Sequence, residues 1–323
     1  MKFDCTKQQI RHIASKNSYT ATNVEKVIRL CLILEDLNRL DDFAGKLLLK
    51  GGTAINLIAF EKLPRLSVDL DLDFAHNLTK EATDAERDRI NRALAAYSEE
   101  MGYRISDRSS VILDSKSLIY TTTTGSVDKI KLDINYHSRC HVYPAVFSEI
   151  QMPFGVEDRI IRVAHLNPIE LFACKIKALY ERCKPRDIFD VYTLAQSGLL
   201  SEVNERNALR KCVVFYSVLG NADRQELLNA DLTAIRNMPF QALKTQLLPM
   251  LHTKSGHFDK DRLFDVAVNY LKSLMSLEES EKDFLNRFFH GEFCPELLFD
   301  KVTATRLREH PAVVHTLQKL SCQ

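Results

Sequence analysis

The segment from Leu66 to Phe74 constrains the fold more than any other part of this chain, because apolar and polar residues alternate along it without a break. Successive side chains of a β-strand point to opposite faces. The pattern therefore predicts a strand with one apolar face and with Asp69, Asp71 and Asp73 together on the other face. Three carboxylates at this spacing repel each other unless something neutralises them. One interpretation is a divalent-metal site, since Mg²⁺ prefers carboxylate oxygens. The other is an exposed edge strand whose charges oppose aggregation.

The remaining patterns predict an α+β protein with a mixed sheet followed by helices. Apolar residues recur at helical spacing over 21–40, and a more polar helix is predicted over 80–101. Short runs predict strands at 46–50, 103–105, 110–113, 117–123, 127–136 and 160–164, with a hairpin turn at Gly125-Ser126. From residue 167 the pattern is helical almost throughout. We therefore expect a mixed α/β domain with N-terminal helices over residues 1–198 and a helical domain over residues 199–323.

Charge balance and apolar content exclude several classes of protein. The 323 residues include 44 Lys and Arg against 43 Asp and Glu, so any nucleic-acid contact needs a local basic patch, for which Arg182–Arg186 and Arg206–Lys211 are candidates. No apolar run approaches the roughly 20 residues of a membrane span, and the N-terminus lacks the apolar core of a secretory signal. The eight cysteines form no Cys-x-x-Cys pair and are predicted to be reduced thiols of a cytoplasmic protein.

A Gly-Gly turn precedes the acidic strand. Gly51, Gly52 and Thr53 lie between the strand predicted at 46–50 and a helical segment at 54–60. Glycines let the backbone approach a phosphate closely, and the first turn of a helix offers free N–H groups and the positive end of its dipole. Most such pairs are ordinary turns. Followed at short range by the acidic strand, however, this turn favours a nucleotide site.

A second alternating segment, residues 129–135, supplies one more carboxylate. Asp133 lies between two apolar residues, so its side chain is expected on the opposite face from theirs. It is a candidate third acid, acting either as a metal ligand or as a general base. The alternative is a cross-strand partner for Lys129 or Lys131.

The helix predicted over 167–182 carries cations on its apolar side. At about 100° per residue, Lys175 and Arg182 fall within the apolar arc, whereas Glu170, Lys177 and Glu181 share a polar face. A buried cation needs a partner, because an unpaired buried charge is costly. A nucleoside triphosphate is one such partner. The alternative is that both side chains extend along the apolar surface and place their charges in water.

Two sequence blocks in combination resemble the AbiEii-type nucleotidyltransferase toxins, which belong to the DNA polymerase β-like superfamily. The resemblance covers roughly residues 20–196 and implies a polymerase β-like core. Residues 197–323 show no motif that we can assign. The first block is Gly-Gly-Thr-Ala at 51–54 with Arg-x-Ser-x-Asp-Leu-Asp at 65–71, and the second contains Glu170, Lys175, Arg182, Arg186, Asp187 and Asp190.

The resemblance implies ligands and roles for these residues. NTP is the expected substrate, and Asp69 and Asp71 are expected to hold one or two Mg²⁺ ions, although Asp73 is an extra acid that competes with Asp71 for the second position. Asp187 or Asp190 is expected to complete the site or to orient a base; the alternative is a helix start with an Arg186–Asp190 ion pair. The residues expected to contact the nucleotide are Gly51, Gly52, Thr53, Arg65, Ser67, Lys175 and Arg182.

The implied function is that of the toxin in a toxin–antitoxin system. By this resemblance the chain transfers nucleotides from an NTP to an RNA acceptor, the 3′ end of tRNA, and inhibits translation or growth. Its expected partners are the NTP, the RNA and a cognate antitoxin protein. The alternatives are a nucleotidyltransferase that modifies a protein or a small molecule, and a non-catalytic nucleotide-binding module.

Overall fold

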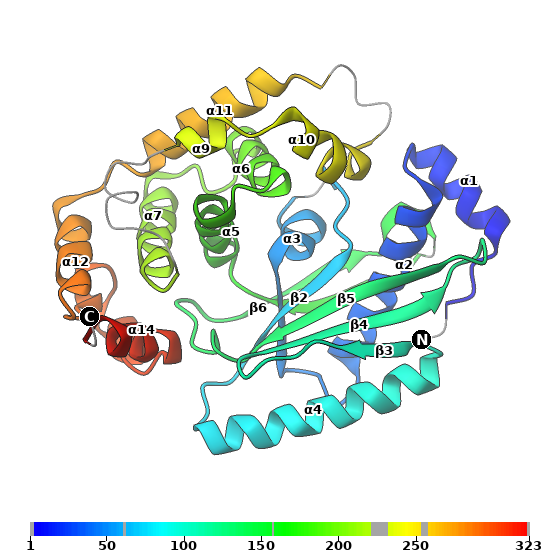
Figure 1. The fold of residues 1–323 in the computed structure, drawn as a ribbon, viewed down its shortest axis with the longest axis horizontal. Helices are drawn as coiled ribbons and strands as arrows, with labels where there is room; N and C mark the ends of the chain where they lie inside the picture. Colours follow the sequence, from blue (N-terminus) through cyan, green and yellow to red (C-terminus); the bar gives the residue numbers. More distant parts are fainter. Residues whose placement is uncertain (1–2, 61–62, 157, 221–231, 253–257, 322–323) are drawn as a thin grey trace. The chain divides into compact units, whose positions relative to one another are not determined.

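A computed structural model of the chain describes residues 3–60, 63–156, 158–220, 232–252 and 258–321 (Figure 1). It divides into two compact units. The sheet unit comprises Met1–Arg139, Ala145–Leu166 and Met250–Ser255, and the helical unit comprises Cys140–Pro144, Asn167–Pro249 and Gly256–Gln323. The boundary predicted at residue 198 falls inside the helical unit, because the two helices after residue 166 pack with later helices of that unit.

One mixed sheet organises the sheet unit. Its strand order is β3-β4-β5-β2-β1-β7-β6, with β2 antiparallel to β1 and parallel to β5, and with β1 parallel to β7. The strands are β1 (Leu47–Lys50), β2 (Asp69–Phe74), β3 (Arg104–Asp107), β4 (Leu113–Thr121), β5 (Val127–Asn135), β6 (Val146–Gln151) and β7 (Ile160–His165). The helices of this unit are α1 (Lys7–Asn17), α2 (Ala21–Arg39), α3 (Gly51–Ala54), the π-helical η1 (Ile55–Ala59), α4 (Lys80–Met101) and the 3₁₀ turn η2 (Pro153–Gly155).

The alternation predicted for the acidic strand is confirmed in β2. Leu70 and Leu72 are 0% and 1% exposed, whereas Asp69 and Asp71 on the other face are half-buried. The strand begins at Asp69 and not at Leu66, because its pairing with β5 starts at Asp69, and the Leu66 N–H donates instead to the Met250 carbonyl (2.9 Å). The apolar face of β2 thus belongs to the core, and the acids lie on the polar face.

Helices α2 and α4 cover the apolar face of the sheet, and Figure 1 shows α4 running beside β3, β4 and β5. Asp114, on the buried face of β4, accepts hydrogen bonds from Arg87 Nε (3.0 Å) and Asn91 Nδ2 (2.9 Å) of α4. On α2, Asn38 Oδ1 accepts a hydrogen bond from the Ala164 N–H of β7 (2.8 Å). The polar faces of β4 and β5 therefore point away from α4.

Strands β4 and β6 differ from the sequence prediction. The runs at 110–113 and 117–123 give a single strand, Leu113–Thr121, because it pairs with β5 over its whole length. The hairpin at Gly125-Ser126 is confirmed, with the Thr122 N–H donating to the Ser126 carbonyl (2.8 Å). No pattern predicts β6, because Ile150 is its one buried residue and the strand lies at the edge of the sheet.

The helical unit confirms the helical prediction for the chain after residue 167. Phe215 lies in its core and contacts the rings of Phe293, Phe299 and His310. Its helices are α5 (Pro168–Arg182), α6 (Pro185–Ser197), α7 (Val203–Val218), α9 (Thr233–Arg236), α10 (Phe240–Gln246), α11 (Lys260–Leu274), α12 (Glu279–Phe289), α13 (Lys301–Leu307) and α14 (Pro311–Ser321), and 3₁₀ turns lie at η3 (Leu248–Met250) and η4 (Pro295–Leu297). Over the described ranges, no helix has the length and apolar character needed to cross a membrane.

Candidate functional site

The Gly-Gly turn packs directly against the acidic strand. β1 ends at Lys50, and α3 begins at Gly51, whose φ of +68° lies in the left-handed region that favours glycine. A Cβ at Gly51 would lie 2.2 Å from Asp71 Oδ2, and a Cβ at Gly52 would lie 2.8 Å from Arg65 Nη2. Two features therefore require glycine at position 51: its backbone has a positive φ, and the Asp71 carboxylate leaves no room for a Cβ.

Three side chains of the first sequence block are buried around this turn. Thr53, Arg65 and Ser67 are 0%, 1% and 8% exposed. Thr53 Oγ1 lies 3.0 Å from Ser67 Oγ and 2.5 Å from the Asp69 carbonyl oxygen, and Arg65 Nη1 donates to the Leu66 carbonyl (2.9 Å). The bond from Thr53 ties the turn to the first residue of β2, and the bond from Arg65 stays within the segment before that strand. Contact of the three side chains with a nucleotide stays a prediction.

Strand register brings the candidate acids together. In the parallel pairing of β2 with β5, Asp71 is opposite Asp133 and Asp69 is opposite Lys131, so these side chains share the polar face. Neighbouring strands lie about 4.8 Å apart, which places Asp133 within reach of a ligand bound by Asp71. Asp133 Oδ1 accepts a hydrogen bond from the Ser115 hydroxyl (2.8 Å), and its Oδ2 lies 2.5 Å from Lys131 Nζ. The alternative predicted for Asp133, an ion pair with a lysine, is therefore also present. Its partner Lys131 lies on the same strand, however, and not on a neighbouring one.

The extra acid, Asp73, already has a counter-charge. It is 2% exposed, and its Oδ1 lies 2.5 Å from Lys50 Nζ. Asp73 is also buried, whereas Asp71 is half-buried, so Asp71 stays the prediction for the second metal-binding position. No sequence pattern predicted Lys50 as the partner of Asp73. The available signal was its charge at the end of a buried strand, directly before the Gly-Gly turn.

Lys175 lies in the helical unit and is buried, as its place in the apolar arc predicts. It is 6% exposed, and its Nζ lies 2.9 Å from Asp187 Oδ1 and 3.1 Å from Asp190 Oδ2, both on α6. Two carboxylates of the next helix are therefore the partner that this buried cation requires. Burial alone would raise the pKa of Asp187, but Lys175 and Arg182 outweigh that effect and lower the pKa to about 2.

Of the other two predictions for this helix, Arg182 follows the alternative, in which its charge reaches water, and the placement of Glu170 on a polar face is wrong. The Arg182 side chain is 57% exposed, because it lies in the last turn of α5, where its Nε reaches Asp187 Oδ2 at 2.7 Å. Glu170 is 0% exposed and does not share a polar face with Lys177 and Glu181. It accepts hydrogen bonds from the Tyr216 hydroxyl (2.5 Å) and from the backbone N–H groups of residues 142 and 143, and burial raises its pKa.

The acids of the sheet unit form a donor set that fits magnesium. In the part of the chain that the structure describes, no group of three or more His, Cys, Asp or Glu side chains is gathered as for a preformed metal site. Asp69 and Asp71 nevertheless share one strand face, with Asp133 beside them. Mg²⁺ is usually held by one or two protein carboxylates, while water and substrate phosphates complete its shell. These residues therefore suit an ion that binds together with a nucleotide.

A family profile agrees with this geometry. The family described as "Nucleotidyl transferase AbiEii toxin, Type IV TA system" matches residues 32–273. The chain belongs to this family. It is therefore a nucleotidyltransferase toxin of the type IV toxin–antitoxin class, which implies an NTP substrate and an antitoxin partner. The match also continues beyond residue 196, where the resemblance seen in the sequence ends, to residue 273.

A solved structure shares the fold of this AbiEii-family chain. It is MenT4, a nucleotidyltransferase toxin from Mycobacterium tuberculosis H37Rv, with a TM-score of 0.61, 14% sequence identity, and coverage of 98% of this chain and 99% of that chain. At this identity the likeness concerns the fold alone, and it confirms the predicted α+β nucleotidyltransferase architecture. None of the curated proteins matches the chain.

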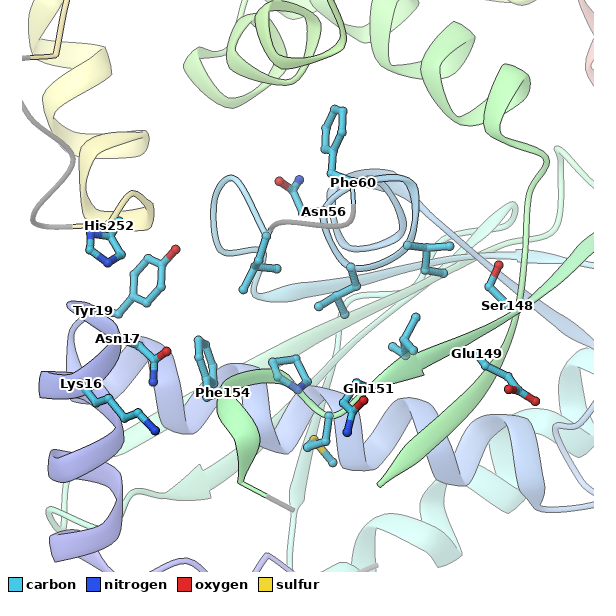
Figure 2. A pocket seen from close by; sticks show the side chains of 16 residues that line it. Lys16, Asn17, Tyr19, Asn56, Phe60, Ser148, Glu149, Gln151, Phe154 and His252 are labelled. Carbon is cyan, nitrogen blue, oxygen red and sulfur yellow. The ribbon is translucent and has the colours of Figure 1, made fainter. Parts of the chain in front are cut away.

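A hollow of about 830 Å³ lies elsewhere in the sheet unit of this AbiEii-family chain (Figure 2). The rings of Phe154 and His252 both meet Tyr19 edge to face, with centroids at 6.0 Å and 5.5 Å from it. Asn56 also lines the hollow and donates through Nδ2 to the Gly52 carbonyl (2.8 Å), which links this wall to the Gly-Gly turn. The candidate acids do not line it, so the hollow is separate from the proposed metal position.

Proposed function

We propose that this toxin transfers a nucleotide from an NTP to the 3′ end of an RNA acceptor, tRNA, in a Mg²⁺-dependent reaction that inhibits translation or growth. Family membership supports the reaction class. The observation that carries the proposal is that Asp69, Asp71 and Asp133 share one sheet face while Asp71 packs against the Gly51 backbone. The tRNA acceptor rests on resemblance to the family.

In the proposed reaction, the acceptor hydroxyl oxygen attacks the α-phosphorus of the NTP. A new oxygen–phosphorus bond forms, and the bond to pyrophosphate breaks. Asp69 and Asp71 would hold Mg²⁺, which when bound neutralises charge on the phosphates. Asp133, opposite Asp71 in the register, would take the proton of the attacking hydroxyl.

Positioning and charge neutralisation carry most of the rate enhancement in such a reaction. The buried hydrogen bonds of Thr53 and Ser67 serve this purpose, because they hold the turn at a constant distance from β2. Contact of Lys175 and Arg182 with the triphosphate, and a role of Asp187 in completing the site or orienting a base, remain predictions from the resemblance.

Labelled NTPs, incubated with the purified protein, Mg²⁺ and total RNA or total protein, test the proposal. Label is expected in RNA, and it should disappear with Asp69→Ala or with a chelator. Because the variant relieves repulsion between carboxylates, its melting temperature should be unchanged or slightly raised. Asp84→Ala, an exposed acid of α4, is the matched control and should keep full activity.

The remaining outcomes identify the alternatives. Label in protein alone would show a protein-modifying transferase, and NTP binding without any transfer would show a non-catalytic module. Full activity of Asp69→Ala would contradict the assignment of the metal site. Growth arrest on expression, relieved by Asp69→Ala and not by Asp84→Ala, links the chemistry to toxicity.

A further inference from the structure

The polar face of the sheet continues beyond the acids, and there its charge changes sign. Lys131 of β5 lies opposite Asp69 of β2, Ser117 of β4 lies opposite Lys131, and Ser106 of β3 lies opposite Ser117. Paired residues on neighbouring strands project from the same face. A row of four side chains thus runs across four strands, from a carboxylate through a cation to two hydroxyls.

A hollow of about 130 Å³ is lined by three members of this row, Lys131, Ser117 and Ser106. We call its lining the basic strand face. Arg108, Lys129 and Lys131 are exposed, whereas the serines are half-buried beside them. The lining is Ser106, Arg108, Ser115, Ser117, Lys129 and Lys131, together with Ile119.

We infer that the basic strand face binds backbone phosphates of the RNA acceptor, next to the end that is extended. This inference rests on the proposed function. Strands lie about 4.8 Å apart, so Ser117 and Ser106 are two and three strand spacings from Asp69, or about 10–14 Å. That distance suits the nucleotides that precede the reacting hydroxyl, on a continuous path along one face.

The chemistry of the lining favours phosphate over other ligands. Arg, Lys and Ser side chains are typical phosphate contacts in protein–nucleic acid complexes. Asp133 pairs with Lys131, but over the described ranges neither Arg108 nor Lys129 forms an ion pair. Two cations beside hydroxyl groups, on a chain whose net charge is only +1, form a local positive patch complementary to a polyanion.

The basic clusters proposed from the sequence fit this role less well. In the Arg206–Lys211 cluster, Arg210 is 7% exposed, and its Nε lies 2.8 Å from Glu281 Oε2. In the Arg182–Arg186 cluster, Arg182 is paired with Asp187. In both clusters a carboxylate neutralises one cation, as Asp133 does for Lys131 on the basic strand face, but neither cluster belongs to the strands that carry the candidate acids.

The double variant Arg108→Ala/Lys129→Ala tests the inference. Lys131 is left intact because it contacts the candidate acid Asp133. Binding of a fluorescein-labelled single-stranded oligoribonucleotide is measured by anisotropy across a salt series, without NTP. Each lost phosphate contact reduces the slope of log K against log salt by about 0.7, so two contacts reduce it by about 1.4 and weaken binding about 25-fold at 0.1 M salt.

Arg89→Ala/Arg92→Ala is the matched control, because it removes the same charge from exposed positions of α4. It should leave the affinity for the oligoribonucleotide and the salt slope unchanged. In steady-state assays with labelled NTP and tRNA, the Arg108→Ala/Lys129→Ala variant should raise KM for tRNA and leave KM for the NTP as in the wild type.

The outcomes separate this inference from the proposed function. If wild type and double variant label RNA with equal KM for tRNA and equal salt slopes, the inference is overturned and the proposed function stands. If the wild type labels no RNA, the proposed function fails and the inference fails with it. If the double variant loses affinity for its antitoxin and keeps its affinity for RNA, the face is a protein interface and the inference is overturned.

Discussion

Gly51→Ala tests whether nucleotide transfer depends on the close approach of the turn to Asp71. A non-glycine residue at a φ of +68° costs about 1–2 kcal/mol. The new Cβ would lie 2.2 Å from Asp71 Oδ2, whereas ordinary contact starts at 3.4 Å. The carboxylate therefore has to move by about 1.2 Å, the difference between these two distances. A displacement of about 1 Å in a reacting constellation costs about a hundredfold in rate.

The expected result is a loss of about 1–2 kcal/mol in the free energy of unfolding, together with a roughly hundredfold slower transfer. Denaturant unfolding measures the first quantity, and the initial rate of labelled-nucleotide incorporation measures the second. Gly45→Ala is the matched control, since Gly45 has a φ of +72° and an added Cβ there would meet nothing within 4 Å. It should lose similar stability and keep its activity. Equal transfer rates for Gly51→Ala and Gly45→Ala would refute this reasoning, because backbone strain alone would then account for any loss of activity.

Three further predictions concern the strand and the buried ion pairs. Asp71→Asn should abolish nucleotide transfer while Asp73→Asn largely preserves it, because Lys50 already neutralises Asp73; the reverse order in the incorporation assay would exchange their roles. Leu70→Asp should unfold the sheet unit, since Leu70 is 0% exposed; a cooperative melt with wild-type circular dichroism would show that the two faces of β2 are reversed. The pKa of Asp187 is lowered from 3.8 to about 2 in the folded chain. The ionised carboxylate therefore stabilises the fold by about 2 kcal/mol above pH 4. This contribution disappears as the pH falls from about 4 to about 2. Asp187→Asn should accordingly be less stable at pH 7 and should show a flatter pH dependence in that window; identical unfolding curves from pH 2 to 7 would contradict the ion-pair assignment.

Local patterns were sufficient for the elements whose periodicity is unbroken. The alternation in β2 and β5, the hairpin at Gly125-Ser126 and the helix α4 are all as predicted, because side-chain period and turn chemistry act between near neighbours. Edge strand β6 was not predictable in this way, since Ile150 is its one buried residue and its pairing with β7 defines it.

The helix around Lys175 shows where such patterns stop being informative. Its periodicity shows that Lys175 is buried, but not that Asp187 and Asp190 are its partners. It also misplaces Glu170, because the groups that bind this carboxylate come from residues 142–143 and from Tyr216, far from it in the chain.

The order of amino acids alone is enough to show that Asp69 and Asp71 share a strand face, that a Gly-Gly turn comes shortly before them, and that the chain resembles a nucleotidyltransferase toxin. Strand order and register, in contrast, depend on pairing between distant segments, which no local pattern encodes. The folded chain was therefore needed to place Asp133 opposite Asp71, to pair Asp73 with Lys50, and to extend the acidic face into a basic one on β5, β4 and β3.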